Sequence, residues 1–433
     1  MKKTVTVNVK HLARVEGHGN IDVKIKNGKL EHAKWEVVET PRFFEMLLKG
    51  KNWDNAPMIT GRICGICSIG HTLASIRAVE NAFGIVPDKQ TEKLRILLKH
   101  METLQSHALH LCFLVLPDFM NTGSVLPLIK SHGDVVLRAA KVKKLANDLC
   151  DCVGGRRMHP TRTVVGGFTM LPEKGELQGF NERLKEIMDD LVLVAELFKG
   201  FDLPDFTRET EFVSLKGENN YPFIGGDLIS TDGVLAKESE YKKMTNEYMT
   251  DQSTSKWCKL SRDSFAVGAL ARLNNNYDYL HTAAKEVAEL FGLRPVNHNP
   301  FMNNIAQLVE CVHVVKESIT LINDLLDSDM KNSRQEVKVK AGVGVAAVEV
   351  PRGILYHSYE FDKKGKIVKC DCVIPTGQNH ANIQHDLEGI AGEYATKGKE
   401  DRELELLAEM LVRAYDPCIS CSTHFLKLKV DRS

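Results

Sequence analysis

The sequence has no long apolar run, no excess of charge of either sign and no apolar signal-peptide core at its start. Its longest uninterrupted apolar stretch, about Leu111–Leu116, is far shorter than the roughly 20 residues that span a membrane. Lysine plus arginine number 57, as do aspartate plus glutamate, so nothing indicates nucleic acid or an anionic membrane as a partner. We therefore expect a soluble, cytoplasmic chain without a membrane span, although export in company with a signal-bearing partner stays open.

Internal repeats, low-complexity tracts and obvious linkers are also missing, so residues 1–433 are expected to form a single domain. Period-two alternation predicts a strand meander near the N-terminus and a second small sheet near the C-terminus, over Val5–Val9, Ile21–Ile25, Leu30–Val37, Glu336–Val350 and Ile354–Ile374. Most of the remaining chain has helical patterns, at Ser68–Phe83, Thr91–Val115 (stopping near Pro117), Asp134–Asp151, Glu176–Lys199, Ala283–Phe291, Gln307–Leu326 and Glu400–Ala414. These patterns predict an α+β fold that is predominantly helical, with surface loops and short strands over Phe201–Ser261.

The eleven cysteines are odd in number and scattered, which argues against a disulfide framework and for thiols or metal ligands. Four of them form two Cys-x-x-Cys pairs, Cys64/Cys67 and Cys418/Cys421, and this spacing lets two thiolates converge on one metal. Two such pairs also make a structural zinc site, but zinc ribbons hold their pairs about 15–20 residues apart. Here most of the chain separates the pairs. From the spacing alone, zinc and a redox metal both remain open.

The residues that flank the pairs carry more information. Early in the chain stands Arg-x-Cys-Gly-x-Cys-x-x-x-His, ending at His71, and near its end stands Asp-Pro-Cys-x-x-Cys-x-x-His, ending at His424. These motifs resemble the large, catalytic subunit of nickel–iron hydrogenases. Further motifs of that family occur in the family's order at Arg14–His18, Pro41–Glu45, Val350–Gly353 and Cys372–Thr376. The resemblance implies a central bundle of long helices between the small N-terminal and C-terminal β-sheets.

The same resemblance implies that Cys64 and Cys418 are terminal ligands of nickel, while Cys67 and Cys421 bridge nickel to an iron that carries cyanide and carbon monoxide. The implied activity is reversible heterolytic cleavage of H2. Glu16 would accept a proton from Cys418. Without the resemblance, the sequence would favour an ordinary surface or salt-bridged glutamate at this position. A carboxyl group with a tunable pKa suits such a relay.

Several polar residues would support that centre. Arg352, which follows Pro351 on a turn, would hold its guanidinium over the open metal face and touch a cyanide. The resemblance makes the remaining residues supports: Thr376 would donate to a cyanide, Asp416 would pair with Arg352, and His71 would hydrogen-bond a bridging thiolate. Many membrane-linked relatives have an aspartate at the position of Ser106, so the charged network around the arginine is expected to be smaller here.

A magnesium ion is the second implied metal, bound by Glu45, His424 and the backbone carbonyl of Cys372, with iron as the minority alternative at that position. In the family, a dedicated endopeptidase removes a short C-terminal extension just after the histidine matched by His424. Phe425–Ser433 would be that extension; because it alternates, it also fits a terminal strand.

The chain has no glycine-rich dinucleotide loop, flavin motif or additional cluster motif, so its electrons need an iron–sulfur small subunit. The motifs most resemble cytoplasmic, bidirectional NAD(P)-linked hydrogenases and the sulfhydrogenase alpha subunits, which implies diaphorase-type flavin partners. Deazaflavin-reducing and heterodisulfide-reductase-linked hydrogenases remain alternatives. A metal-free, quinone-binding relative from respiratory complex I would lack the cysteine pairs, and a zinc-stapled binding protein is the non-enzymatic alternative.

Overall fold

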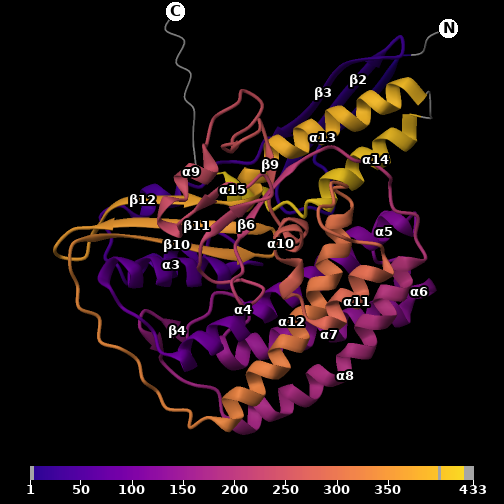
Figure 1. Cartoon of the computed structure of the whole chain (residues 1–433). Coiled ribbons are helices and arrows are strands. Elements are labelled where there is room, and N and C mark those ends of the chain that lie inside the picture. The colour runs from indigo at the N-terminus through magenta and orange to yellow at the C-terminus, as the bar shows by residue number, and fades with distance from the viewer. Residues whose placement is uncertain (1–3, 398–400, 424–433) are drawn as a thin grey trace, which may run out of the picture.

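A bundle of long helices occupies one half of the molecule, and small sheets occupy the other (Figure 1). The computed structural model describes residues 4–397 and 401–423. Four helices form the bundle: α4 packs against α7 and α12, and α8 packs against the same two helices. Their bounds are α4 Lys89–Leu109, α7 Gly133–Gly154, α8 Lys174–Lys199 and α12 Met302–Asp327. The predicted bundle of long helices is confirmed.

Local sequence sets several of the helix ends. The side chain of Asp88 accepts the backbone N–H of Thr91 and so caps the start of α4. At the other end of the preceding helix, α3 (Ser68–Phe83), Gly84 adopts φ 74° and closes the last turn. Both ends of α3 fall where the sequence predicted them.

The helical run ends at Phe119, close to the predicted stop near Pro117, but it is not one regular helix. After α4 the chain continues as a π-helical segment, η1 (His110–Val115), and then as α5 (Leu116–Phe119). Pro117 lies in the first turn of α5, where a helix does not use the backbone N–H that proline lacks. The proline is therefore accommodated at a change of helix type.

The two predicted sheets are present, and both are antiparallel meanders. The N-terminal sheet has the order β1-β2-β3, and the C-terminal sheet has the order β10-β11-β12. Helix α3 packs against β10 and β11. The strands are β1 Val5–Val9, β2 Gly19–Lys26, β3 Lys29–Val37, β10 Gly342–Val350, β11 Gly353–Phe361 and β12 Ile367–Val373.

The segment predicted as surface loops and short strands contributes to the core. Its strand β6 (Glu211–Leu215) is buried along its whole length. It belongs to a four-stranded sheet of order β8-β7-β6-β9, completed by β7 Leu228–Ser230, β8 Leu235–Ala236 and β9 Phe265–Ala266. The polar composition of this segment hid its buried strand.

The remaining elements are short, apart from two helices near the C-terminus. Those two are α13 Pro375–Lys397 and α14 Asp401–Ala414, and the others are α1 Phe44–Leu48, α2 Asn55–Thr60, α6 Leu128–Ser131, α9 Lys242–Thr245, α10 Ala269–Asn276, α11 Thr282–Leu290, α15 Ile419–Ser422, η2 Glu238–Glu240, η3 Tyr277–Tyr279, β4 Thr163–Val164 and β5 Gly167–Phe168. In the part of the chain described, no helix combines the length and the apolar character that a membrane crossing needs.

The last two long helices pack against the N-terminal sheet. The yellow helices α13 and α14 lie along the indigo N-terminal sheet, where α13 packs on β3 and α14 on β1 (Figure 1). Gln384 of α13 accepts the backbone N–H of Trp35 over 2.8 Å and donates to the carbonyl of Ala33 over 2.7 Å. The loop after β1 reaches the segment that carries the second cysteine pair, since the backbone N–H of Ile419 donates to the carbonyl of Glu16 over 2.9 Å.

Candidate metal centre

Three of the four cysteines predicted to hold nickel and iron converge on one point. The sulfur atoms of Cys64, Cys418 and Cys421 lie within 4.8 Å of one another, and all three side chains are buried. Cys67 lies beside them, because its backbone N–H donates to the sulfur of Cys64 over 3.2 Å. The structure thus brings both Cys-x-x-Cys pairs into one buried cluster.

Cys418 and Cys421 form a disulfide, with sulfur atoms 2.50 Å apart, and the sulfur of Cys64 lies 3.6 Å from that of Cys418. The other nine cysteines are free, as the scattered spacing predicted. Soft metal ions bind thiolates, so metal binding here requires the disulfide to be reduced. By donor type, a buried set of thiolates fits nickel and iron, and it fits zinc as well.

One arginine ties the loops of the two pairs together. The guanidinium of Arg42 donates to the carbonyl of Ile63, next to Cys64, over 2.6 Å, and to the carbonyl of Ser420, next to Cys421, over 2.6 Å. In the sequence, Arg42 stands out only as part of a motif, and no role was predicted for it. Its neighbours in sequence offered no signal, since the two carbonyls belong to segments far along the chain.

The surroundings distinguish the two thiols of the first pair. A hydrogen bond from the Cys67 thiol, together with the charge of Arg352, lowers the pKa of Cys64 although burial opposes this. The same hydrogen bond and burial raise the pKa of Cys67 well above its usual value. Cys64 is therefore the favoured thiolate of the pair, and Cys67 is the donor.

Glu16 lies directly against the second pair. One oxygen of its carboxylate lies 3.2 Å from the sulfur of Cys418 and accepts the backbone N–H of Ser420 over 3.1 Å, and the other oxygen accepts from the hydroxyl of Ser420. Gly17 permits this approach: its φ is +86°, and a side-chain carbon there would lie 2.7 Å from the nitrogen of Ser420. The predicted proximity of Glu16 to Cys418 is present in the structure.

Arg352 is buried beside the cluster, on the turn between β10 and β11. It donates to the carboxylate of Asp416 over 2.9 Å and to the backbone carbonyl of the same residue over 2.9 Å. The hydroxyl of Ser106 is 3.5 Å from its third nitrogen. Burial works against the charge, but the Asp416 carboxylate raises the pKa of Arg352, which stays cationic. The pairing with Asp416 is as predicted.

The other predicted supports also lie near the cysteines. The hydroxyl oxygen of Thr376 accepts the backbone N–H of Cys418 over 2.9 Å. His71 is buried in the first turn of α3, with Nδ1 3.1 Å from Nε2 of His357. His357 in turn contacts Tyr359, whose hydroxyl lies 2.7 Å from Nδ1 of His357. Neither His357 nor Tyr359 was predicted from the sequence.

The predicted magnesium ligands are present in part. The carboxylate of Glu45 accepts the backbone N–H of Cys372 over 3.0 Å, so the two predicted ligands are neighbours. Burial raises the pKa of Glu45, although that hydrogen bond opposes the rise. Glu247 and Lys256 line the same small cavity and form an ion pair of 2.8 Å. His424 and Phe425–Ser433 lie outside the described residues.

Buried polar side chains from α4, η1 and α12 meet in a network that sequence periodicity missed. His107 and His110 are buried, and both are hydrogen-bonded. His107 contacts the carboxylate of Glu310 at 2.7 Å, and His110 contacts the amide oxygen of Gln307 at 2.6 Å. Gln307 in turn donates to Asp416 over 3.2 Å, which ties the network to the partner of Arg352.

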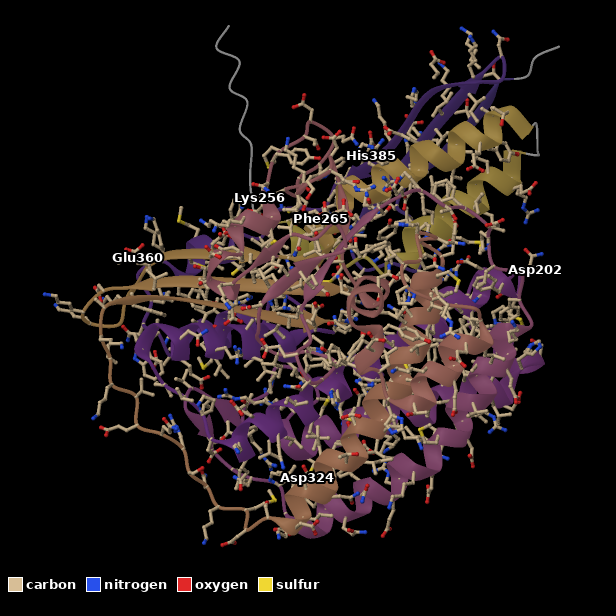
Figure 2. The ribbon with its side chains drawn as sticks, viewed as in Figure 1. Asp202, Lys256, Phe265, Asp324, Glu360 and His385 are labelled. Carbon is tan, nitrogen blue, oxygen red and sulfur yellow. A yellow bond between two sulfur atoms is a disulfide. The ribbon has the colours of Figure 1, made fainter. Side chains whose placement is uncertain are left out.

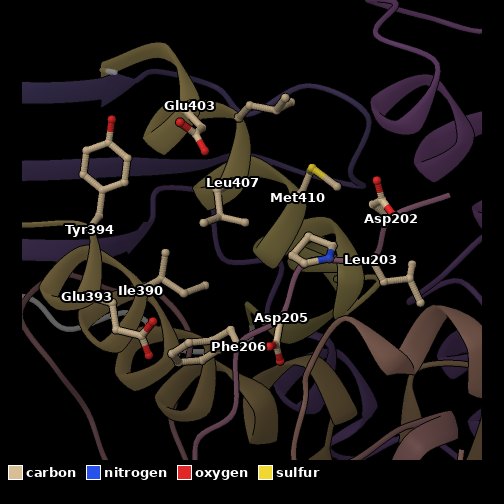
Figure 3. A pocket seen from close by; sticks show the side chains of 12 residues that line it. Asp202, Leu203, Asp205, Phe206, Ile390, Glu393, Tyr394, Glu403, Leu407 and Met410 are labelled. Carbon is tan, nitrogen blue, oxygen red and sulfur yellow. The ribbon is translucent and has the colours of Figure 1, made fainter. Parts of the chain in front are cut away.

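A cavity of about 590 Å³ lies apart from the cysteine cluster (Figure 3). Apolar side chains of α13 and α14 and the segment Asp202–Phe206 line it, with Glu393 and Glu403 at its edge. Figure 2 shows that the two cavities lie in different parts of the molecule. Asp202 lines the 590 Å³ cavity, and Lys256 lines the cavity next to Glu45. The lining of the 590 Å³ cavity includes none of the predicted site residues.

Comparisons with known proteins agree with this geometry. Residues 42–136 and 229–424 match the family model for nickel-dependent hydrogenases. The sulfhydrogenase 1 alpha subunit of Pyrococcus furiosus is 34% identical, over 98% of this chain and 98% of that protein. A subunit of the F420-non-reducing hydrogenase of Methanothermobacter thermautotrophicus (strain Delta H) is 30% identical, over 97% of this chain and 95% of that protein.

A solved NAD+-reducing [NiFe]-hydrogenase, in its H2-reduced state, superposes with a TM-score of 0.86 at 26% identity, covering 97% of this chain and 99% of that one. The predicted fold is therefore confirmed. The chain belongs to the nickel-dependent hydrogenase family. It is a catalytic subunit of the nickel–iron type, which makes it an oxidoreductase and implies a nickel–iron centre.

Proposed function

We propose that Cys64, Cys67, Cys418 and Cys421 hold the nickel–iron centre at which this chain cleaves H2 reversibly. The observation that carries the proposal is the buried convergence of three of these thiols within 4.8 Å, with the fourth beside them. Cys64 and Cys418 would be terminal ligands of nickel, and Cys67 and Cys421 would bridge nickel and iron. When bound, that centre supplies the heterolytic cleavage of H2.

The residues around the cysteines would handle the proton and the charge. Glu16, 3.2 Å from the sulfur of Cys418, is placed to take a proton from that thiol. Ser420 holds both oxygens of the carboxylate in place, so the acceptor is oriented before the proton arrives. Arg352 keeps its charge because Asp416 pairs with it, and it supplies a fixed buried cation next to the cluster.

We further propose that the iron carries cyanide and carbon monoxide, with Thr376 and Arg352 (next to Pro351) as partners of the cyanides and His71 as donor to a bridging thiolate. Magnesium would bind at Glu45, the Cys372 carbonyl and His424. The adjacency of Glu45 and Cys372 supports this second site. Hard oxygen ligands suit magnesium, and an imidazole ligand leaves iron as the alternative.

For the electron route we propose a small iron–sulfur partner subunit that passes electrons to diaphorase-type flavin subunits, which reduce NAD(P) in the cytoplasm. The likeness to an NAD+-reducing hydrogenase and to a sulfhydrogenase alpha subunit supports this route. The likeness to an F420-non-reducing hydrogenase favours a second candidate, in which the same catalytic domain, residues 1–433, serves a heterodisulfide-reductase-linked complex.

Metal analysis of the purified complex tests the proposal. Plasma mass spectrometry should find nickel near one atom per chain, and the complex should reduce a redox dye with H2. Zinc in place of nickel, with no H2-dependent dye reduction, would contradict the proposed centre and favour a structural zinc site. Adding NAD+, NADP+ or a heterodisulfide as acceptor then separates the two candidate electron routes.

The C-terminal segment has its own expected outcome. If Phe425–Ser433 is an extension that keeps the site open until metal enters, active protein should end at His424. The intact mass of nickel-loaded protein, compared with that of protein made without nickel, measures this directly. Active protein that still carries Ser433 would contradict processing and support the terminal strand.

A further inference from the structure

Arg272, in α10, uses every N–H group of its guanidinium inside the core. Its Nε and Nη2 donate to the two carboxylate oxygens of Glu310 over 2.6 and 2.7 Å, and its Nη1 donates to Glu349 over 3.0 Å. The remaining two N–H groups donate to the backbone carbonyls of Val350 over 3.0 Å and Pro351 over 3.2 Å. A guanidinium has five N–H groups, and all five are engaged.

The two carbonyls that Arg272 binds immediately precede Arg352. The segment just before α10 also packs against this turn. Gly353 has φ +130°, and a side-chain carbon there would lie 2.4 Å from the side chain of Val267. Gly268 has φ +127°, and a side-chain carbon there would lie 3.5 Å from the carbonyl oxygen of Arg352. The backbone that carries Arg352 is therefore closely packed as well as hydrogen-bonded.

The carboxylates that fix Arg272 are fixed in turn by other elements. Glu310 of α12 accepts the hydroxyl of Tyr221 over 2.7 Å and contacts His107 of α4 at 2.7 Å. Glu349 accepts the backbone N–H of Leu215 over 2.8 Å. Burial opposes ionisation of Glu310, but the charge of Arg272 lowers the pKa of this carboxyl, so a buried ion pair forms. Each of the two carboxylates that bind Arg272 is thus itself hydrogen-bonded to another part of the chain.

We propose that Arg272 is a positioning residue for Arg352: by binding the carbonyls of Val350 and Pro351, it sets where the Arg352 guanidinium lies over the cysteine cluster. This inference rests on the proposed function. Asp416 orients the end of the Arg352 side chain, whereas Arg272 fixes the backbone from which that side chain extends. Both anchors are needed, because a displacement of about 1 Å in a reacting group costs up to roughly 100-fold in rate.

A buried arginine of this kind also stabilises a fold, and the chain offers a matched control for that effect. Arg95 is likewise buried, donates to both oxygens of Glu80 over 2.9 and 2.7 Å, and donates to the backbone carbonyl of Val164 over 3.0 Å. None of its partners is a predicted site residue. Replacement by lysine removes the forked geometry from both arginines in the same way.

The test compares Arg272→Lys with Arg95→Lys in the complete hydrogenase complex. Nickel content, the infrared bands of the iron-bound carbon monoxide and cyanide, and H2 turnover are measured for each. Both variants should lose thermal stability. Arg272→Lys should keep nickel, shift the cyanide bands and lose at least about tenfold in turnover, whereas Arg95→Lys should keep wild-type bands and nearly wild-type turnover.

Wild-type bands in Arg272→Lys, with turnover no lower than in Arg95→Lys, would overturn the positioning role and leave the proposed function intact. Absence of nickel from the wild-type complex would instead overturn the proposed function. If Arg272→Lys does not load nickel, Glu310→Gln takes its place. The amide offers Arg272 one acceptor oxygen at residue 310 in place of the two oxygens of the carboxylate. Shifted cyanide bands in Glu310→Gln then support the positioning role, and unchanged bands overturn it.

Discussion

Replacing Cys64 or Cys421 by serine should abolish H2 turnover and strip nickel from the chain. An alcohol at neutral pH is a far poorer ligand for a soft metal than a thiolate, and no other side chain in the described cluster can replace the lost sulfur. Nickel should fall from about one per chain to near zero in each variant. Plasma mass spectrometry and H2-dependent dye reduction measure the two losses.

The control is Cys112→Ser, which changes the same atom in a buried thiol outside the cluster. Burial alone raises the pKa of Cys112 to about 12, so it stays a thiol and acts as a small apolar group. This variant should lose some stability but keep nickel and most of its turnover. Nickel-loaded, active Cys64→Ser protein would remove the cysteine cluster from the mechanism.

Glu16→Gln should reduce turnover by about 100-fold or more, the lower range for loss of a positioned acid–base group. The amide keeps the size of the carboxyl and still accepts from Ser420, so the loop should remain in place. Nickel and iron should stay bound. Exchange between deuterium gas and water protons measures the proton step without the electron route, and it should fall together with turnover.

Glu36→Gln provides the comparison, because Glu36 is also partly exposed and lies in the N-terminal sheet, where its carboxylate accepts a long contact of 3.4 Å from Asn20. It should behave as wild type. Wild-type exchange rates in Glu16→Gln would show that the proton leaves by another group, even if the metals are bound as proposed.

Segments in which apolar residues recur at a regular spacing were predictable from the sequence. The β1-β2-β3 meander alternates along each strand, and α3 has a small-residue start and a glycine end, so both were placed almost to the residue. The cysteine pairs and their flanking motifs predicted which residues cluster, while the roles proposed for them came from the family resemblance. Each of these signals is local, which is why it could be read without a structure.

Helix α13 shows why other parts were missed. It is buried along most of its length, yet the buried positions include Gln378, Asn379, His380, Asn382 and Gln384. Most of their polar atoms bond to partners that lie far away in sequence, such as Trp35 for His380 at 3.1 Å. Since amphipathic periodicity assumes that polar residues face water, a helix with polar residues buried on several sides gives no signal.

Arg42 and Arg272 were missed for a related reason. Both act on backbone carbonyls, at Ile63 and Ser420 for Arg42 and at Val350 and Pro351 for Arg272. Every residue has a carbonyl, so nothing in the sequence marks which ones will be bound. Only the folded chain shows that two loops with chemistry-bearing residues are held by arginines outside them.

The closeness of the two cysteine pairs also bears on how the protein is made. The sulfurs of Cys64 and Cys418 meet across 354 positions of sequence. At about 5–20 residues per second, synthesis of the intervening chain takes roughly 20–70 s. During that interval the first pair has emerged without its partners, so its thiols are open to oxidation or to the wrong metal. If both pairs hold nickel, as proposed, nickel can be bound completely only after the second pair has been translated.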